Sequence, residues 1–342
     1  MTGFHEIQVG DRLLGPGRPA LLVAEIGGNH GGDPALAEIL VRAAARAGAG
    51  AVKFQAYRAR SFLSPLSPYY RDLAAEELPF ATLAALVRLG QSLGLAAGLT
   101  VFDEEGLALA ETAGADFLKI SSGDLTHHRL LARAAEAGRP LFLSTGAGEE
   151  AEVEAALAVL APVRERLVVL QCTALYPAPP VSANLAVLAR RLGCGPAAGY
   201  SDHVPGLDAS RLALSLGALV LEKHFTTDRS RPGGDNALSA TPEEFRQLAD
   251  WAEEVVLLTG SPVKRVQPGE EAVRPLIRRA LVLTRDRPAG AGLTSADLAL
   301  KRPPAAGPGL LGPDQLEPVL GRVLKRALAE GAALTKDDLA DA

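Results

Sequence analysis

The sequence predicts an α/β fold, in which a (β/α)8 TIM barrel is followed by a small C-terminal domain. Eight short apolar runs alternate with Ala- and Leu-rich amphipathic stretches between residues 20 and 260. Strands that alternate with helices form parallel sheets, and eight such units in about 250 residues are typical of a closed barrel. An open doubly wound sheet is the alternative. It is disfavoured because IGGNHGG places Asn29 and His30 where a dinucleotide-binding turn needs small residues.

Each predicted element has its own signal. The predicted strands are the apolar runs 20–26, 50–55, 95–102, 116–121, 140–145, 167–172, 196–201 and 218–224. Apolar residues follow helical spacing between them, for example at 34–48, 128–138 and 206–217, with glycines at several expected helix ends. Thr241 with Glu244 three residues later predicts the N-terminus of the last barrel helix.

The domain limits follow from a change of composition after the barrel. We expect a catalytic barrel at 1–262, a polar, Pro-containing linker at 263–275 and a second domain at 276–342. Inside that domain GAGLTSADL (290–298) aligns with GAALTKDDL (331–339), and each copy predicts a turn followed by a Thr-capped helical turn. A module of about 65 residues is marginally stable alone, so we expect it to dock on a partner surface.

Composition excludes several classes of protein. The chain has 342 residues with 35 basic and 40 acidic side chains, a net charge of −5, so no excess of positive charge indicates nucleic acid. No apolar run approaches the roughly 18 residues that span a bilayer, and the N-terminus lacks a secretion signal. The two cysteines, Cys172 and Cys194, form no CxxC pair. We therefore expect a cytoplasmic protein without membrane or nucleic-acid partners.

Polar residues gather where each predicted strand ends. In a (β/α)8 barrel these carboxyl ends form the active site, so the pattern favours an enzyme. The residues in strand order are Glu25, Asn29 and His30; Lys53 and Gln55; Thr100 and Asp103; Lys119, Ser121, Ser122 and Asp124; Ser144 and Thr145; Gln171, Thr173 and Tyr176; Tyr200, Ser201, Asp202 and His203; Glu222, Lys223 and His224.

Two of the three lysines among these residues, Lys53 and Lys119, interrupt otherwise apolar runs. An unpaired buried ammonium is costly, so Lys53 and Lys119 predict a bound anion or structural ion pairs. With Ser122, Ser144 and Ser201 they form a plausible cradle for phosphate and carboxylate groups.

His203 and His224 end the adjacent seventh and eighth strands, which lie about 5 Å apart, so both imidazoles can reach one metal ion. Glu25 on the first strand adds a reachable carboxylate. Mn²⁺ fits best, and Mg²⁺, Co²⁺, Zn²⁺ and Fe²⁺ remain open. The alternative is a pair of hydrogen-bonded core histidines.

Cys172 is expected to pack in the barrel, with no base beside it.

Two further residues lie on loops. Asp235 follows the eighth strand and predicts either a turn or a ligand for sugar hydroxyls. Arg302 lies in KRPPAAGPG (301–309), where nearby prolines restrict the backbone, so it is suited to reach into another site.

Ordered motifs along nearly the whole chain resemble the sialic acid synthase family, whose members join a (β/α)8 barrel to a C-terminal antifreeze-like SAF domain. The motifs are AEIGGNHGGD (24–33), AVKFQAY (51–57), LKISSGD (118–124), LSTGA (143–147), CTALYPAP (172–179), GYSDHVPG (199–206), EKHFTTDRSRPGGD (222–235) and KRPPAAGPG (301–309).

This resemblance implies that phosphoenolpyruvate condenses with an N-acetylmannosamine-type aldose to give a nine-carbon 2-keto acid and phosphate. The positions that match phosphoenolpyruvate-binding residues are Lys53, Thr100, Lys119, Ser122, Ser144 and Ser201. His203 and His224 match metal ligands, and Glu25 matches a carboxylate that handles water or the intermediate. Those that match sugar contacts are Gln55, Asp124, Tyr176, Asp235 and Arg302, the last delivered by the second subunit of a domain-swapped homodimer.

Some positions depart from the family pattern. Asp124 stands where Glu is common, Ala174 where Asn or Ser is usual, Val101 where Pro is usual and Asn236 where His is typical. These departures leave the sugar open among N-acetylmannosamine, its 6-phosphate and pseudaminic, legionaminic or spore-coat precursors.

Two other functions compete with this one. A Schiff-base aldolase would use Lys119 or Lys223 as its nucleophile. A non-catalytic carbohydrate- or ice-binding protein is suggested only by the C-terminal module, and it leaves the polar strand ends unexplained.

Overall fold

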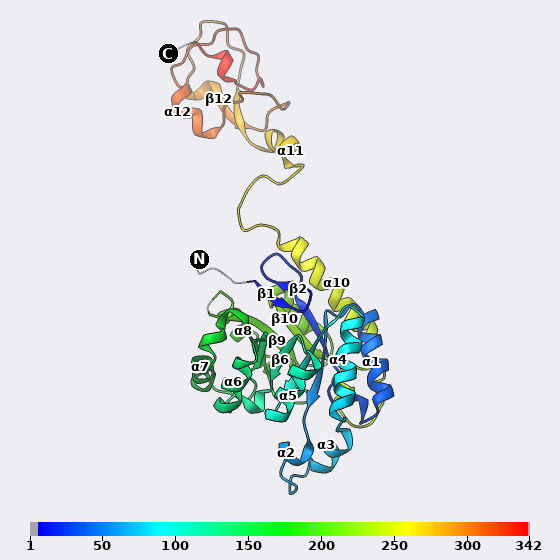
Figure 1. Cartoon of the computed structure of the whole chain (residues 1–342). Coiled ribbons are helices and arrows are strands. Elements are labelled where there is room, and N and C mark those ends of the chain that lie inside the picture. Colours follow the sequence, from blue (N-terminus) through cyan, green and yellow to red (C-terminus); the bar gives the residue numbers. More distant parts are fainter. Residues whose placement is uncertain (1–5, 194, 341–342) are drawn as a thin grey trace. The chain divides into compact units, whose positions relative to one another are not determined.

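The structure is a computed structural model that describes residues 6–193 and 195–340. The chain divides into two compact units, Met1–Gly260 and Ser261–Ala342, which are described separately below (Figure 1). In the described residues, no helix is both long and apolar enough to cross a membrane.

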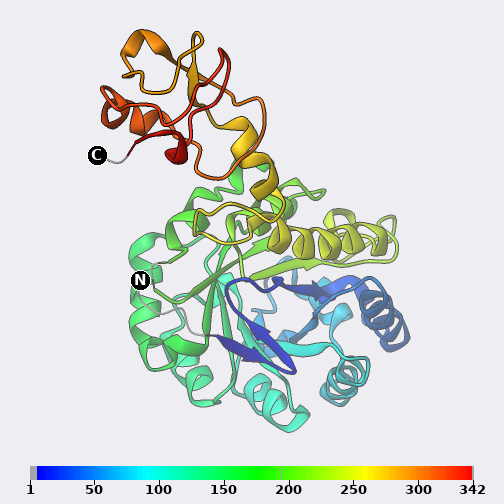
Figure 2. The same ribbon diagram turned by 90° about the horizontal axis from the view of Figure 1, so that it is seen from above.

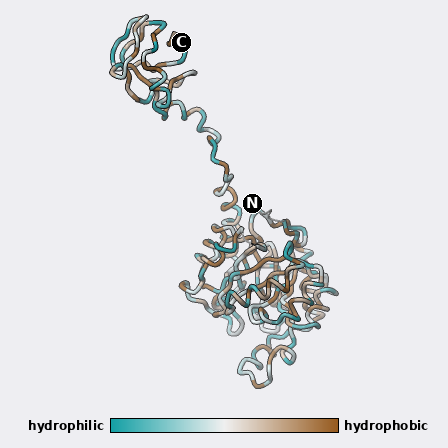
Figure 3. The backbone as a smooth tube through the Cα atoms, turned by 90° about the vertical axis from the view of Figure 1, so that its left-hand side faces the viewer, coloured by the Kyte–Doolittle hydropathy of each residue, from teal (hydrophilic) through white to brown (hydrophobic). Residues whose placement is uncertain are grey.

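The first unit is a closed barrel of eight parallel strands, as the sequence predicts. The strands follow the chain around the barrel, and the last pairs with the first. They are β3 (Leu21–Glu25), β4 (Ala51–Ala56), β5 (Ala96–Val101), β6 (Phe117–Ile120), β7 (Leu141–Ser144), β8 (Leu167–Cys172), β9 (Ala197–Asp202) and β10 (Val220–His224). Brown, hydrophobic segments concentrate in the body of this unit in Figure 3.

Helices surround the barrel (Figure 2). They are α1 (Pro34–Arg46), α4 (Phe80–Ser92), α5 (Glu104–Ala113), α6 (His128–Glu136), α7 (Glu150–Val159), α8 (Ala186–Arg191), α9 (Asp208–Leu216) and α10 (Pro242–Thr259). Local sequence sets several ends: Asp33 caps α1 ahead of Pro34, and left-handed Gly217 ends α9. The expected capping box of Thr241 and Glu244 is present at the start of α10.

The barrel interior changes from apolar to polar along each strand. Successive lumen-facing residues are two positions apart, as with Phe117 and Lys119 on β6 or Phe142 and Ser144 on β7. The two phenylalanine rings stack with centroids 4.6 Å apart. A Cβ at Gly98 would lie 2.3 Å from the Phe117 ring, so this position has room only for glycine.

A short hairpin that the sequence pattern does not predict covers the apolar end of the lumen. Its strands are β1 (Ile7–Val9) and β2 (Arg12–Leu14), and Ile7, Val9 and Leu14 join the apolar cluster inside the barrel. Water is thereby kept from one end of the lumen. The polar residues occupy the other end, where the strands finish.

The long connection after β4 lies at that polar end, opposite the hairpin in Figure 1. It contains α2 (Ala59–Phe62) and α3 (Tyr70–Glu76). The hydroxyl of Tyr57 donates to the carbonyl of Leu73 at 3.1 Å. A Cβ at Gly32 would lie 2.2 Å from the carbonyl oxygen of Ala75, so glycine permits the close packing of α3 on the loop after β3.

Short 3₁₀ helices complete the barrel loops. They are η1 (Gly27–His30), η2 (Ser122–Asp124), η3 (Ala161–Arg166), η4 (Pro180–Ser182) and η5 (Asn236–Leu238).

The second unit is small and has its own core. Its elements are α11 (Glu270–Ile277), β11 (Ala280–Leu283), η6 (Ser295–Asp297), β12 (Leu298–Lys301), η7 (Pro313–Gln315), α12 (Leu316–Val319) and η8 (Lys336–Asp338). The core is built mostly of leucines, among them Leu281, Leu293 and Leu334. Helix α11 occupies the end of the segment 263–275, for which the sequence predicts only a polar linker.

The two copies of the sequence repeat in the second unit make the same side-chain contacts. Thr294 Oγ1 donates to Asp297 at 2.7 Å, and Arg285 Nε donates to the same carboxylate at 2.8 Å. Thr335, Asp338 and Arg326 make the same contacts at 2.7 and 2.6 Å. Both predicted Thr-capped turns are therefore confirmed, each as a capping box.

Candidate active site

The carboxylate of Glu222 lies between two lysines at the polar end of the lumen. Lys119 Nζ donates to Glu222 Oε1 at 2.7 Å, and Lys53 Nζ lies 3.9 Å from Oε2. Ser201 Oγ also donates to Oε1, at 2.9 Å. These three partners were predicted to hold an anion. Glu222 itself had no predicted role. Two-residue alternation places it on the same side of β10 as His224, but only the closed barrel shows that this side faces the lumen.

Glu25 pairs with Lys53 beside this centre. The two side chains form an ion pair with at most 3% of either exposed. Lys53 Nζ also donates to Thr100 Oγ1 at 2.6 Å, and Gln55 Nε2 donates to Glu25 Oε1 at 3.1 Å. The structure therefore brings together two residues expected to bind phosphoenolpyruvate, one expected to contact the sugar, and Glu25, which was expected beside the metal and to handle water or the intermediate.

The two buried glutamates titrate differently. Burial raises the pKa of Glu25, and Lys53 only partly offsets this. Burial acts on Glu222 too, but the nearby ammonium groups of Lys119 and Lys53 outweigh it and lower the pKa to about 2. Burial alone would lower the pKa of Lys53, yet the two carboxylates raise it. Of the two carboxylates, Glu222 is therefore the one held as an anion, and Glu25 is the more easily protonated.

The predicted serines lie around the same lumen. Ser144 Oγ is buried without a hydrogen-bond partner, among the residues that the structure describes. Ser122 Oγ accepts from the backbone N–H of Gly146 at 3.0 Å and also interacts with the thiol of Cys172. An unpaired buried hydroxyl is uncommon and fits a ligand oxygen.

The two histidines predicted to bind a metal ion lie next to each other. The ring centroids of His203 and His224 are 5.5 Å apart. His203 Nδ1 lies 2.7 Å from the carbonyl oxygen of Thr173. A carbonyl only accepts, so Nδ1 carries the proton and Nε2 keeps a lone pair. Burial lowers the pKa of both imidazoles, which are therefore neutral.

This pair fits a divalent cation. Nδ1 of His224 is buried and has no hydrogen-bond partner in the described chain, and neutral imidazoles are the metal-binding form. The Asp235 carboxylate lies 3.4 Å from that nitrogen. Glu25, expected to complete the group, is instead engaged by Lys53 and Gln55. Within 6–193 and 195–340, no three His, Cys, Asp or Glu side chains form a ready metal cluster.

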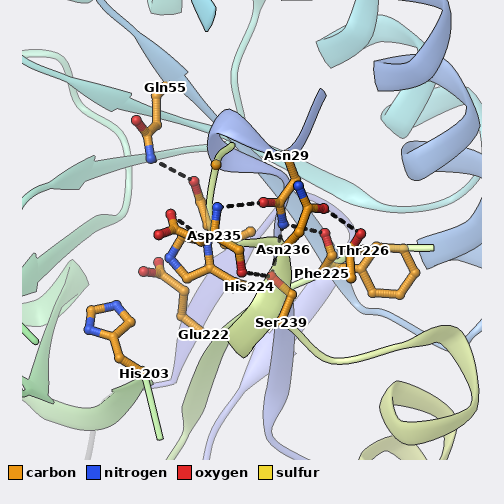
Figure 4. A network of polar contacts seen from close by, with 12 residues as sticks. Asn29, Gln55, His203, Glu222, His224, Phe225, Thr226, Asp235, Asn236 and Ser239 are labelled. Atoms are coloured by element: carbon orange, nitrogen blue, oxygen red, sulfur yellow. Dashed lines mark hydrogen bonds and ion pairs between the residues drawn. The ribbon is translucent and has the colours of Figure 1, made fainter. Parts of the chain in front are cut away.

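Asp235 is held by a network rooted in the loop after β3 (Figure 4). Its backbone N–H donates to Asn29 Oδ1 at 2.8 Å, and Asn29 Nδ2 donates to Ser239 Oγ at 2.9 Å. Ser239 Oγ donates in turn to the carbonyl of Asp235 at 2.7 Å. Burial raises the pKa of Asp235 to about 6, and nearby Glu25 contributes to the rise.

Asn236, where the family typically has His, holds the loop after β10 together. Asn236 is buried, with Oδ1 accepting from Thr226 Oγ1 at 2.6 Å and Nδ2 donating to the carbonyl of Gly233 at 3.0 Å. Its side chain is therefore committed to the loop. Val101, another departure, is buried in the core around the barrel.

The other predicted sugar residues have separate surroundings. The Tyr176 ring centroid lies 4.0 Å from that of His203, and half of Tyr176 is exposed. Asp124, at the end of η2, accepts from Ser121 Oγ at 2.6 Å. Arg302 is exposed and follows β12 in the second unit, which is described separately from the barrel.

Two residues differ from their expected surroundings. Cys172 was expected to have no histidine or base placed to activate it. A histidine does lie beside it, with Nδ1 of His203 3.8 Å from Sγ, but that nitrogen carries a proton and so cannot accept the proton of the thiol. Burial raises the pKa of this thiol, so it stays protonated. Lys223, a candidate nucleophile, does not face the lumen. Its Nζ donates to Asp202 Oδ2 at 2.8 Å on the outer side of the barrel wall.

Two family models match the chain. The model of the NeuB family matches residues 40–264, and the model of the SAF domain matches residues 278–340.

Individual relatives match over most of their length. The N,N'-diacetyllegionaminic acid synthase of Legionella pneumophila is 35% identical over 95% of this chain and 96% of that protein. The N-acetylneuraminate-9-phosphate synthase of Mus musculus is 30% identical, with 85% of each chain covered. The solved N-acetylneuraminic acid (sialic acid) synthetase of Leptospira borgpetersenii superposes with a TM-score of 0.74 at 31% identity, over 78% of this chain and 94% of that chain.

Proposed function

Because the chain belongs to the NeuB family and carries a SAF domain, we propose that it condenses phosphoenolpyruvate with an N-acetylmannosamine-type aldose. The products are a nine-carbon 2-keto acid and phosphate. The observation that carries this proposal is the buried pair of Lys53 and Lys119 around Glu222, next to two neutral histidines. The names of the relatives support the synthesis of nine-carbon sugar acids.

The lysines and hydroxyls suit phosphoenolpyruvate. With both glutamates ionised, the two lysines and two glutamates have no net charge. Protonation of Glu25, which its raised pKa favours, leaves one positive charge for the anionic substrate. Ser144 Oγ has no hydrogen-bond partner among the described residues, and the other proposed contacts are Thr100, Ser122 and Ser201. Charge-assisted hydrogen bonds from such groups hold phosphate and carboxylate oxygens.

His203 and His224 would hold a divalent cation, for which Mn²⁺ is our first candidate, with Mg²⁺ or Co²⁺ as alternatives. Such an ion supplies a Lewis acid that polarises the aldehyde of the open-chain sugar. The chain supplies the remaining chemistry. The lysines hold the phosphate and carboxylate oxygens of phosphoenolpyruvate while a bond forms between its C3 and the aldehyde carbon.

Glu25 then handles a proton. Protonated Glu25 would donate its proton to the aldehyde oxygen, which becomes a hydroxyl, and the resulting carboxylate would then accept a proton from the water that adds at C2. The hydroxyl at C2 loses its proton to the departing phosphate as the bond from C2 to the phosphate oxygen breaks, which releases phosphate and leaves the keto group. General base catalysis needs a carboxylate that can take a proton near neutral pH. Glu25 suits this step better than Glu222, because burial raises its pKa while the two lysines keep Glu222 ionised.

The sugar would lie toward Gln55, Tyr176 and Asp235, with Asp124 further along the rim.

We also propose a domain-swapped homodimer in which Arg302 of a second copy completes this site. Mixing a Glu25→Gln chain with an Arg302→Ala chain should then restore part of the activity in verified heterodimers. Activity that stays at the level of the separate variants would contradict a shared site.

The aldolase alternative gains no support. Lys223 is buried outside the lumen against Asp202, and Lys119 donates to Glu222, so neither offers a free amine. A non-catalytic binding protein gives no reason to bury this many charges in the lumen.

The decisive experiment measures phosphate release from phosphoenolpyruvate with Mn²⁺ and a panel of aldoses, using the full chain. We expect release only with an N-acetylated mannose-type sugar, and its loss on chelation with EDTA. Borohydride with a keto-acid substrate should trap no adduct. A trapped adduct, or no release with any sugar, would overturn the proposed reaction.

A further inference from the structure

A buried ion pair lies behind the two histidines, on the outer side of the barrel wall. Lys223 on β10 stands opposite Asp202 on β9 in the register of the two strands. Lys223 Nζ donates to Asp202 Oδ2 at 2.8 Å, and neither side chain is more than 1% exposed. Side chains alternate between the two sides of a strand. The pair therefore faces the helices, while His203 and His224 face the lumen.

The same pair binds the backbone that follows His203. Lys223 Nζ donates to the carbonyl of Val204 at 2.8 Å, and the N–H of Val204 donates to Asp202 Oδ1 at 2.9 Å. Ser210, in the first turns of α9, also donates to Asp202. Both neighbours of His203 in the chain are thus held by one ion pair.

The pair also adjoins His224, which directly follows Lys223. The carbonyl of His224 accepts from the N–H of Ala240 at 2.8 Å, so its other side is tied to the loop before α10. The backbone segments that carry the two imidazoles are therefore joined through Lys223 and Asp202, and the ring centroids lie 5.5 Å apart.

The geometry points to Lys223 and Asp202 as positioning residues that set the spacing and orientation of His203 and His224 for a divalent cation. This inference rests on the metal site proposed above. A buried ion pair is a weak stabiliser, because the cost of removing both charges from water offsets much of their attraction. Two apolar side chains could pack the same space. They could not make the directional bonds to both polar groups of Val204.

The test separates positioning from stability with two variants of the full chain. Lys223→Met with Asp202→Asn removes both charges, roughly preserves volume, and leaves an amide oxygen to accept from Val204. No unpaired charge stays buried. Leu214→Ala is the matched control, since Leu214 is a buried residue of α9 whose loss destabilises the same layer without removing the ion pair.

Two measurements use protein freed of metal. Mn²⁺ titration calorimetry should show affinity about 10- to 100-fold weaker in the double variant, as for other residues that orient metal ligands. The control should bind like the wild type, even if its melting temperature is lower. Long-range ¹H–¹⁵N spectra should show His203 as one tautomer, with its proton on Nδ1, in wild type and control. In the double variant both tautomers should appear.

Several outcomes would overturn the inference. One is a double variant with wild-type Mn²⁺ affinity and a single His203 tautomer. Another is a control that loses as much affinity as the double variant, because affinity would then follow stability alone. If the wild type binds no Mn²⁺, the metal step of the proposed function fails, and the tautomer spectra alone decide the inference. If the double variant does not fold, Lys223→Gln with Asp202→Asn replaces it, since this pair also leaves no unpaired buried charge, and the same expectations hold on a smaller scale.

Discussion

Lys119 on β6 reaches across the barrel and donates a 2.7 Å hydrogen bond to Glu222 on β10. The order of strands around the closed barrel places these two on opposite walls. A single carboxylate thus links both sides of the lumen at the level where a substrate anion would bind.

Glu222→Gln should destabilise the protein and weaken phosphoenolpyruvate binding together. Removal of one partner from a buried ion pair costs about 3 kcal/mol or more, because Lys119 and Lys53 lose their shared counterion. Urea unfolding of the full chain measures this loss. Glu104→Gln is the control, since its ion pair with Arg133 is half exposed and should change stability by less than about 1 kcal/mol. Equal effects of the two substitutions would contradict a central role for Glu222.

Ser144→Ala should affect binding without affecting folding. The hydroxyl has no partner within the described structure, so its removal breaks no internal hydrogen bond. A hydrogen bond to a charged ligand contributes about 1.5 kcal/mol or more, which corresponds to a KM for phosphoenolpyruvate about tenfold higher. Steady-state kinetics with both substrates measures this, and the KM for the sugar should stay near its wild-type value. An unchanged KM for phosphoenolpyruvate would remove Ser144 from that site.

The proposed sugar site should prefer an uncharged aldose over its 6-phosphate. Glu76 on α3 accepts from the N–H of Gly234 at 3.0 Å, next to Asp235. Glu76 and Glu25 both contribute to the raised pKa of Asp235, so the negative charges lie close together. An added phosphate would be repelled there. We expect kcat/KM at least about tenfold higher for the uncharged sugar, and a smaller ratio for Glu76→Gln. Equal use of both sugars would show that this carboxylate group lies away from the sugar.

Acid should destabilise the second unit through its repeated aspartates. Hydrogen bonds from Thr294 and Arg285 lower the pKa of Asp297, and the equivalent groups, despite burial, lower that of Asp338. A carboxylate whose pKa is lower in the folded protein stabilises the fold at a pH above its unfolded pKa, about 3.9. This stabilisation disappears as the pH falls toward the pKa of the folded state. Thermal unfolding of the full chain should therefore show a lower transition for this unit below about pH 4.

The matched variant for that experiment is Asp297→Asn with Asp338→Asn. It keeps an oxygen that can cap each turn but removes the titrating charges. Its stability at pH 7 should be lower than that of the wild type, and its dependence on acid should be smaller. An unchanged acid response would show that other carboxylates control this unit.

Much of the barrel could be predicted from local pattern alone. Each apolar run coincides with a strand, and the capping box at Thr241 starts a helix where expected, because both signals depend on residues near in sequence. The hairpin β1–β2 and the long connection with α2 and α3 could not be found this way. Their strands and helices are three to seven residues long, which is too short for periodicity to appear, and they are stable only against the barrel.

The residues of the candidate site were largely found from their place at strand ends, but their partners were not. Glu25 was expected beside the histidines and instead pairs with Lys53. Cys172 was expected to pack without a base and lies near His203. Contacts of this kind depend on rotamers and strand register across the closed barrel, which no local pattern records.

The sequence by itself determined the barrel, the second domain with its repeat, and the set of polar side chains at the strand ends. Only the tertiary structure decided between Glu222 and Lys223, which are adjacent in the chain. One faces the lumen between two lysines, and the other faces the helices and binds Asp202. The physical reason is that neighbouring residues of a strand lie on opposite sides of the sheet, and only closure of the barrel determines which side becomes the site.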